Sequence, residues 1–130
     1  MSLSGKTRIR MADGTNKEIK DLYIGDMISS KDYEHIHIRD ILRGMEEQIC
    51  HLETKNGSNL EATRDQLILT EDGLKAIGKI EIGDKLITSD GTETIEAIYS
   101  KEFNDSVYDI ILEDKDKMIV CENMILKTMF

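Results

Sequence analysis

The sequence predicts an all-β domain made of two similar halves, and three observations support this fold class. Short runs of alternating apolar and polar residues recur between turn sequences, as in β-sandwiches and barrels. A long phrase occurs twice, as DGTNKEIKDLYIGDMI at residues 13–28 and as DGLKAIGKIEIGDKLI at residues 72–87. No long amphipathic helical pattern is present. Two copies are too few for a solenoid, so we expect two halves that cover each other's apolar faces.

The first half is expected to consist of short strands separated by recognisable turns. Residues 7–11 alternate and end at Asp13-Gly14, which is a strong turn sequence. Ile19 and Leu22 are three residues apart, so a strand that begins at Lys17 should give way to one helical turn. The remaining expected elements are strands at 27–28, 35–41, 48–54 and 59–62, a loop at 44–47 and an Asn-Gly hairpin at 55–58, with 40–47 the ambiguous segment.

The second half repeats this plan. Its expected strands are 66–69, 85–88, 94–99, 106–112, 118–120 and 124–126, with turns at 72–73 and 90–91. The pairs Gly25-Asp26 and Gly83-Asp84 each precede a strand. Glycine permits a positive φ and aspartate bonds nearby backbone, so each pair predicts a sharp strand entry, and a catalytic role for Asp26 or Asp84 is disfavoured.

Composition bounds the possible functions. The chain has 130 residues and a net charge of 17 − 26 = −9, which argues against a nucleic-acid surface. No apolar run is long enough to span a membrane and no secretory signal is recognisable, so a cytoplasmic location is favoured. We expect residues 1–130 to form one domain, with repeat halves at roughly 7–62 and 66–126. Residues 1–3 are also compatible with a cloning leader.

The cysteines and histidines do not form a recognisable metal site or cofactor site. Cys50 and Cys121 lie in alternating apolar runs, so two buried free thiols are expected rather than a disulfide. His35 and His37 share one strand face but lack a third ligand, which favours a solvated face. His51 is expected to face solvent between apolar neighbours. We therefore expect neither a metal nor a cofactor.

Several short motifs occur in one order along nearly the whole chain. They are LSGKTRIRMADG, IKDLYIGD, NGSNLEATRD, LTEDGLKAI, a second IGD, and VYDI. Together they resemble the Hint domain, the Hedgehog/intein fold shared by inteins, bacterial intein-like domains and Hedgehog autoprocessing domains. The resemblance implies a horseshoe-shaped β-fold with an internal pseudo-twofold repeat. It also implies self-cleavage chemistry, in which the partner is the polypeptide that flanks the domain.

The resemblance assigns the chemistry of the upstream junction to four positions. Ser2 stands at the nucleophile position, although it could instead belong to a leader or replace a native cysteine. Thr63 and Gln66 match the Thr-x-x-His motif, with glutamine in place of histidine, and glutamine cannot act as a general acid near neutral pH. Asp109 matches the family aspartate in the Val-Tyr-Asp segment, and an exposed strand position is the alternative interpretation.

The downstream motif departs furthest from the family. Lys127 replaces the penultimate histidine, and Thr128 replaces the terminal asparagine that cyclises in inteins. Threonine has no side-chain amide, so succinimide formation at position 128 is chemically impossible. The sequence therefore predicts a Hint-like domain that does not splice. The alternatives are a domain that still cleaves its upstream junction by an acyl shift at residue 2, and a folded spacer or interaction module of a larger protein. The oligomeric state is left open.

Overall fold

A computed structural model describes residues 1–128 as an almost entirely β-structure, in which the only helical elements of this part of the chain are two 3-10 turns. The turns are η1 (Ile19–Asp21) and η2 (Ile77–Lys79). The strands are β1 (Leu3–Ser4), β2 (Arg8–Arg10), β3 (Asn16–Glu18), β4 (Met27–Ser29), β5 (His35–Thr54), β6 (Asn59–Ala62), β7 (Leu67–Thr70), β8 (Gly73–Ala76), β9 (Lys85–Thr88), β10 (Gly91–Leu112), β11 (Met118–Cys121) and β12 (Met124–Lys127). Within residues 1–128, no helix has the length and apolar character needed to cross a membrane.

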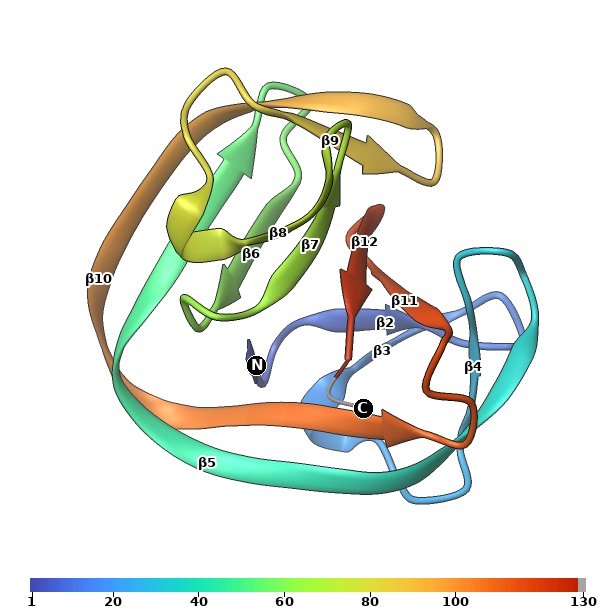
Figure 1. Ribbon diagram of the computed structural model, residues 1–130. Helices are drawn as coiled ribbons and strands as arrows, with labels where there is room; N and C mark the ends of the chain where they lie inside the picture. The colour runs from blue at the N-terminus through green and yellow to red at the C-terminus, as the bar shows by residue number, and fades with distance from the viewer. Residues whose placement is uncertain (129–130) are drawn as a thin grey trace.

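Two long strands, β5 and β10, form the frame of the molecule. They pair antiparallel along most of their length and curve around the shorter strands, which gives the horseshoe outline in Figure 1. The hydrogen-bonded path runs β3-β2-β11-β12-β7-β9-β10-β1-β6-β5-β4, and β8 pairs with β7. The expected all-β fold class is confirmed, and the strand-plus-helical-turn expectation for residues 17–22 is also confirmed by β3 and η1.

Two expectations about the long strands are wrong. Residues 44–47 were expected to form a loop, but they lie inside β5, and residues 44–46 pair with β10. The expected separate strands 94–99 and 106–112 belong to one strand, and the segment between them contains a register shift between Glu102 and Asp105. Residues 42–48 are exposed, so neither face of the ribbon carries the apolar alternation that marks a half-buried strand.

The two halves are related by a pseudo-twofold axis, and equivalent hydrogen bonds occur in both. Leu3 and Ala62, which are equivalent in the repeat, pair directly with each other in β1 and β6, so the axis passes between them. In the first half the N–H of Thr7 donates to Ser4 O at 3.0 Å, and in the second the N–H of Gln66 donates to Thr63 O at 3.1 Å. The segment Ser4–Thr7 is therefore the structural counterpart of Thr63–Gln66.

The repeated Gly-Asp turns are built the same way in both halves. Gly25 and Gly83 have φ angles of 92° and 94°, as the predicted sharp strand entry requires. The Asp26 carboxylate accepts the N–H of Tyr23 at 3.0 Å. The Asp84 carboxylate accepts the N–H of Glu81 at 2.9 Å. These hydrogen bonds lower the pKa of both carboxyl groups, and neither needs a catalytic role to explain its position.

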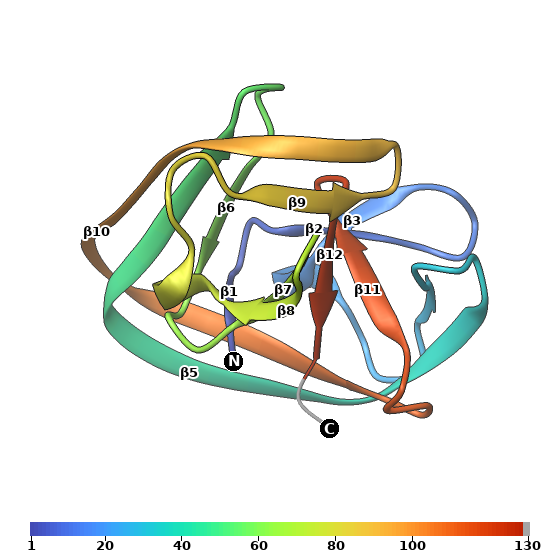
Figure 2. The same ribbon diagram turned by 45° about the horizontal axis from the view of Figure 1, so that its top comes forward.

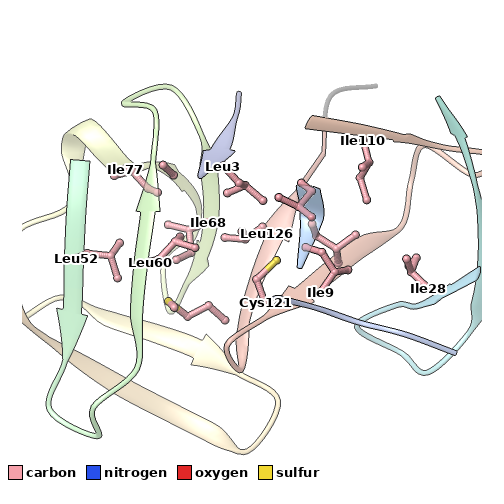
Figure 3. Close-up of a cluster of buried hydrophobic side chains, with 14 of the residues drawn as sticks. Leu3, Ile9, Ile28, Leu52, Leu60, Ile68, Ile77, Ile110, Cys121 and Leu126 are labelled. Carbon is pink, nitrogen blue, oxygen red and sulfur yellow. The ribbon is translucent and has the colours of Figure 1, made fainter. Parts of the chain in front are cut away.

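One cluster of buried hydrophobic side chains joins the halves. Figure 3 shows Leu126 and Cys121 between Leu60 and Ile68 on one side and Ile9 and Ile28 on the other. Cys50 and Cys121 are both buried and free, as expected, and burial raises the pKa of the Cys121 thiol. The strands of both halves thus contribute to one core, around which β5 and β10 close.

Candidate functional site

The first residues of the chain enter the centre of the horseshoe. Figures 1 and 2 show the N-terminus and the end of β12 inside the arc formed by β5 and β10. Leu3 and Ser4 pair with Tyr108 and Val107 of β10, and Leu3 also pairs with Ala62 of β6. Because Leu3 and Ser4 are buried, this short strand fixes residue 2 against its neighbours.

The structure brings Ser2 and Thr63 together, as the motif interpretation requires. The main-chain N–H of Ser2 donates to Thr63 Oγ1 at 2.9 Å. In return, the main-chain N–H of Thr63 donates to Ser2 O at 2.9 Å. Thr63 therefore contacts the nitrogen of the peptide bond between residues 1 and 2, which is the bond that an acyl shift at residue 2 would break.

Asp65 completes this hydrogen-bonded group, and sequence reasoning did not assign it a role. Its Oδ1 accepts the hydroxyl of Thr63 at 2.7 Å, and its Oδ2 forms an exposed ion pair with the N-terminal ammonium group of Met1, at 2.9 Å. The hydrogen bond from Thr63, followed by that from the Met1 nitrogen, lowers the pKa of the Asp65 carboxyl. The sequence feature that could have indicated this role is the Thr-x-Asp spacing, which is typical of local side-chain hydrogen bonding.

Asp109 is buried in β10, so its interpretation as an exposed strand position is wrong. Its Oδ1 accepts the N–H of Ile110 at 2.8 Å. Leu3 pairs with Tyr108 in an antiparallel register, and extending this register by one residue sets Ser2 beside Asp109. By this register, residue 2 lies between Asp109 of β10 and the segment after β6 that contains Thr63 and Asp65.

Gln66 is directed toward the end of β12 by its hydrogen bonds. Its Nε2 donates to Lys127 O at 2.8 Å and to Leu67 O at 3.1 Å. The residue is 1% exposed, and its Oε1 has no hydrogen-bond partner within residues 1–128. Glutamine here can orient the backbone of the downstream segment, but it has no titrating proton for a leaving nitrogen.

Lys127 and Thr128, where the sequence predicts the downstream motif, differ in their contacts. The Lys127 ammonium group donates to the carbonyl of Lys115, at the surface, so only the main chain of Lys127 takes part in the site. Thr128 is 2% exposed, and its Oγ1 has no partner in the described part of the chain. The six residues predicted from the sequence therefore form two groups. Ser2, Thr63 and Asp109 lie near the start of the chain, and Gln66, Lys127 and Thr128 lie near the end of β12. The short segment 63–66 connects the two groups.

A second buried polar group lies in β5, β6 and β10, where none was expected. His51 is buried, so the expectation that it faces solvent is wrong. Its Nδ1 lies 3.0 Å from Glu61 and its Nε2 2.9 Å from Glu53, while Tyr99 stacks on the ring. The Glu61 carboxylate also pairs with Lys6 at 3.2 Å and with Lys101.

Glu61 is held as an ion inside the protein. Burial raises the pKa of a carboxyl group, but here hydrogen bonds from Lys101, His51 and Lys6 outweigh it and lower the pKa of Glu61 to about 2. The exposed pair His35 and His37 lies elsewhere on β5. Within residues 1–128, no group of three or more His, Cys, Asp and Glu side chains is arranged to hold a metal ion.

Sequence comparisons and structure comparisons differ in what they find. No protein-family model and no curated protein matches the chain. The structure is similar to a DnaB intein from Synechocystis sp. PCC 6803, with a TM-score of 0.84, 20% identity, and 99% of each chain covered. It is similar to a bacterial intein-like domain from Clostridium thermocellum, with a TM-score of 0.84, 21% identity, and 98% of each chain covered. The gp41-1 intein matches with a TM-score of 0.82, 18% identity, and 97% of each chain covered.

Proposed function

We propose that this chain, which has the Hint fold of inteins and intein-like domains, is a self-processing domain that acts on its upstream junction and does not splice. The observation that supports this most strongly is the contact between Ser2 and Thr63. The nitrogen of the bond to be broken donates to Thr63 Oγ1 at 2.9 Å, so the motif threonine contacts the reacting peptide unit. Substrate and partner are then one molecule, the polypeptide attached to this domain.

The proposed step is an acyl shift at residue 2. The Ser2 Oγ bonds to the carbonyl carbon of residue 1, while the bond from that carbon to the Ser2 nitrogen breaks. The hydroxyl proton is transferred to the nitrogen, so the products of the shift are an ester and a free amine. A hydroxyl is a weak nucleophile at neutral pH, and a cysteine at position 2 would react faster through its thiolate.

The absence of splicing in this proposal follows from the chemistry of position 128. Cyclisation with release of the downstream flank needs a side-chain amide, and Thr128 has a hydroxyl group instead. Gln66 donates to the carbonyl of Lys127, so it ties the downstream strand to the site without supplying an acid. In this proposal, residues 1–130 act as one domain.

The test uses a reporter fused upstream of the chain, with serine or cysteine at position 2. On incubation with hydroxylamine or dithiothreitol, we expect release of the reporter from the cysteine form, seen on a gel and by mass spectrometry. Thr63→Ala should reduce release about tenfold or more, and Gln66→His should increase it if this position serves the leaving nitrogen. A fusion that stays intact in both forms would refute the proposal and favour a folded spacer or interaction module.

A further inference from the structure

We propose that Asp65 is a positioning residue for the upstream junction, holding the main-chain nitrogen of residue 1 with one carboxylate oxygen and orienting the Thr63 hydroxyl with the other. This inference rests on the proposed function, because it concerns the peptide unit between residues 1 and 2. It assigns the polypeptide preceding Ser2 a specific contact with the domain.

The distances favour one direction for the Thr63 hydroxyl. It has one proton, and Asp65 Oδ1 at 2.7 Å is a much closer acceptor for it than Ser2 O at 3.4 Å. The lone pairs of Thr63 Oγ1 therefore remain for the Ser2 N–H, which donates to it at 2.9 Å. Asp65 Oδ2 lies 2.9 Å from the Met1 nitrogen. The ammonium nitrogen of Met1 and the peptide nitrogen of Ser2, which lie on either side of the residue 1 carbonyl, are thus both bound by this group.

A carboxylate suits this task better than an amide. Both of its oxygens accept, so Asp65 can bind Thr63 and residue 1 at the same time, whereas asparagine has only one accepting oxygen. A hydrogen bond to an ionised acceptor is also stronger than one between neutral groups. In a longer chain the nitrogen of residue 1 belongs to a peptide bond and still carries one proton to donate.

A cleft lies beside Asp65. It has a volume of about 350 Å³, and its lining includes Thr63, Asp65, Ile49 and Cys50. The side chain of Asp65 is 70% exposed, so an incoming polypeptide can reach it without opening the core.

The other half of the molecule supports the assignment through its equivalent residues. The pseudo-twofold relation that superposes Ser4–Thr7 on Thr63–Gln66 makes Lys6 the counterpart of Asp65 and Glu61 the counterpart of Ser2. Lys6 contacts Glu61 at 3.2 Å. The equivalent backbone positions thus each form an ion pair near the start of β1 or the end of β6: Lys6 pairs with Glu61, and Asp65 pairs with the Met1 ammonium group.

The first experiment measures thiol-induced release of an upstream reporter from the full chain with cysteine at position 2. Asp65→Asn should slow release about fivefold, as expected for the loss of one solvent-exposed hydrogen bond. Asp65→Glu, which keeps both accepting oxygens, should recover part of the rate. Asp90→Asn removes an exposed carboxylate from a turn and should leave the rate unchanged. Equal rates for Asp65→Asn and the parent would overturn the inference.

The second experiment does not depend on cleavage. In an upstream fusion with alanine at position 2, amide hydrogen exchange is measured by NMR. Asp65→Asn should raise the exchange rate of the residue 1 amide about fivefold. Amides of the core strand β12 and the Asp90→Asn variant should show no change. A residue 1 amide that exchanges equally fast with and without the carboxylate would refute the inference, whereas failure of all cleavage alone would refute only the proposed function.

Discussion

At the scale of single residues, Gln66 fits the fold but lacks the side chain that the proposed reaction would use as an acid. Gln66 keeps the backbone geometry of its motif, since its N–H donates to Thr63 O as that of Thr7 donates to Ser4 O. Its side chain binds the carbonyl of Lys127 and leaves Oε1 without a partner within residues 1–128. A residue at this position can thus serve the fold fully while lacking the acid that the reaction would use.

The sequence identified the positions of Ser2, Thr63 and Gln66 but not the polar partners that surround them. Asp65 stood inside the recognised motif, yet its contact with residue 1 depends on two segments that are 64 residues apart. His51 lies between apolar neighbours on a strand, a pattern that predicts a solvated side chain. It is buried because Glu61 and Tyr99 on the adjacent strands cover it. The alternation of residues along one strand does not predict which strands lie beside it.

Glu61 gives a prediction about stability at the residue scale. Its pKa is lowered to about 2, so its ionised form is favoured in the folded state relative to an ordinary value of 4.5. This stabilisation is present above pH 4.5 and is lost as pH falls through 2. Glu61→Gln should therefore cost about 2–3 kcal/mol at pH 7, measured by urea denaturation. The difference from the parent should shrink steadily below pH 4.5.

Glu47→Gln is the matched control for this experiment. Glu47 is exposed on β5, so its substitution should change the free energy of unfolding by less than about 0.5 kcal/mol. If Glu61→Gln were equally mild at pH 7, the carboxylate would not be held by Lys101, His51 and Lys6 as described. A difference that grew on acidification would contradict the sign of the pKa shift.

At the scale of elements, the turns were more predictable than the long strands. The Gly-Asp pairs, the Asn-Gly hairpin and the single helical turns follow from local chemistry, and the first and last of these recur in both halves. β5 and β10 did not follow from local chemistry, because residues 42–48 pair with β10 while remaining exposed. Hydrogen bonding across a two-stranded ribbon extends a strand without any apolar alternation to mark it.

The repeated turn makes a prediction that compares equivalent glycines. Gly25 and Gly83 have φ angles of 92° and 94°, and an added Cβ would meet no atom within 4 Å at either site. The cost of alanine is therefore conformational, and Gly25→Ala and Gly83→Ala should each destabilise the protein by about 1 kcal/mol. Thermal or urea unfolding of the two variants should give the same loss within error.

Gly44 supplies the control within the same chain. It lies in strand β5 at an ordinary φ, and a Cβ there would meet Val107 Cγ2 at 3.7 Å, which is normal contact. Gly44→Ala should leave stability within about 0.5 kcal/mol of the parent or raise it. Unequal losses for Gly25→Ala and Gly83→Ala, or a loss at Gly44 as large as theirs, would count against equivalent left-handed turns.

At the scale of the whole molecule, two equivalent halves surround two segments whose side chains differ in chemistry. Thr63, Asp65 and the buried Asp109 lie near residue 2, whereas β12 is followed by Thr128, whose side chain has no amide. The repeat and its turns predicted an all-β fold of two similar halves, because both halves need them to build one core, and the motif resemblance supplied the horseshoe shape. The state of the two junctions depends on side chains that the repeat does not constrain.

A chain flanked by a different reporter on each side, with cysteine at position 2 and Thr128 unchanged, tests this asymmetry most directly. Intact mass spectrometry after incubation with dithiothreitol should show the free upstream reporter and the domain still joined to the downstream reporter. A product in which the two reporters are joined to each other, or a downstream reporter released on its own, would contradict the account, as would an upstream reporter that no thiol releases.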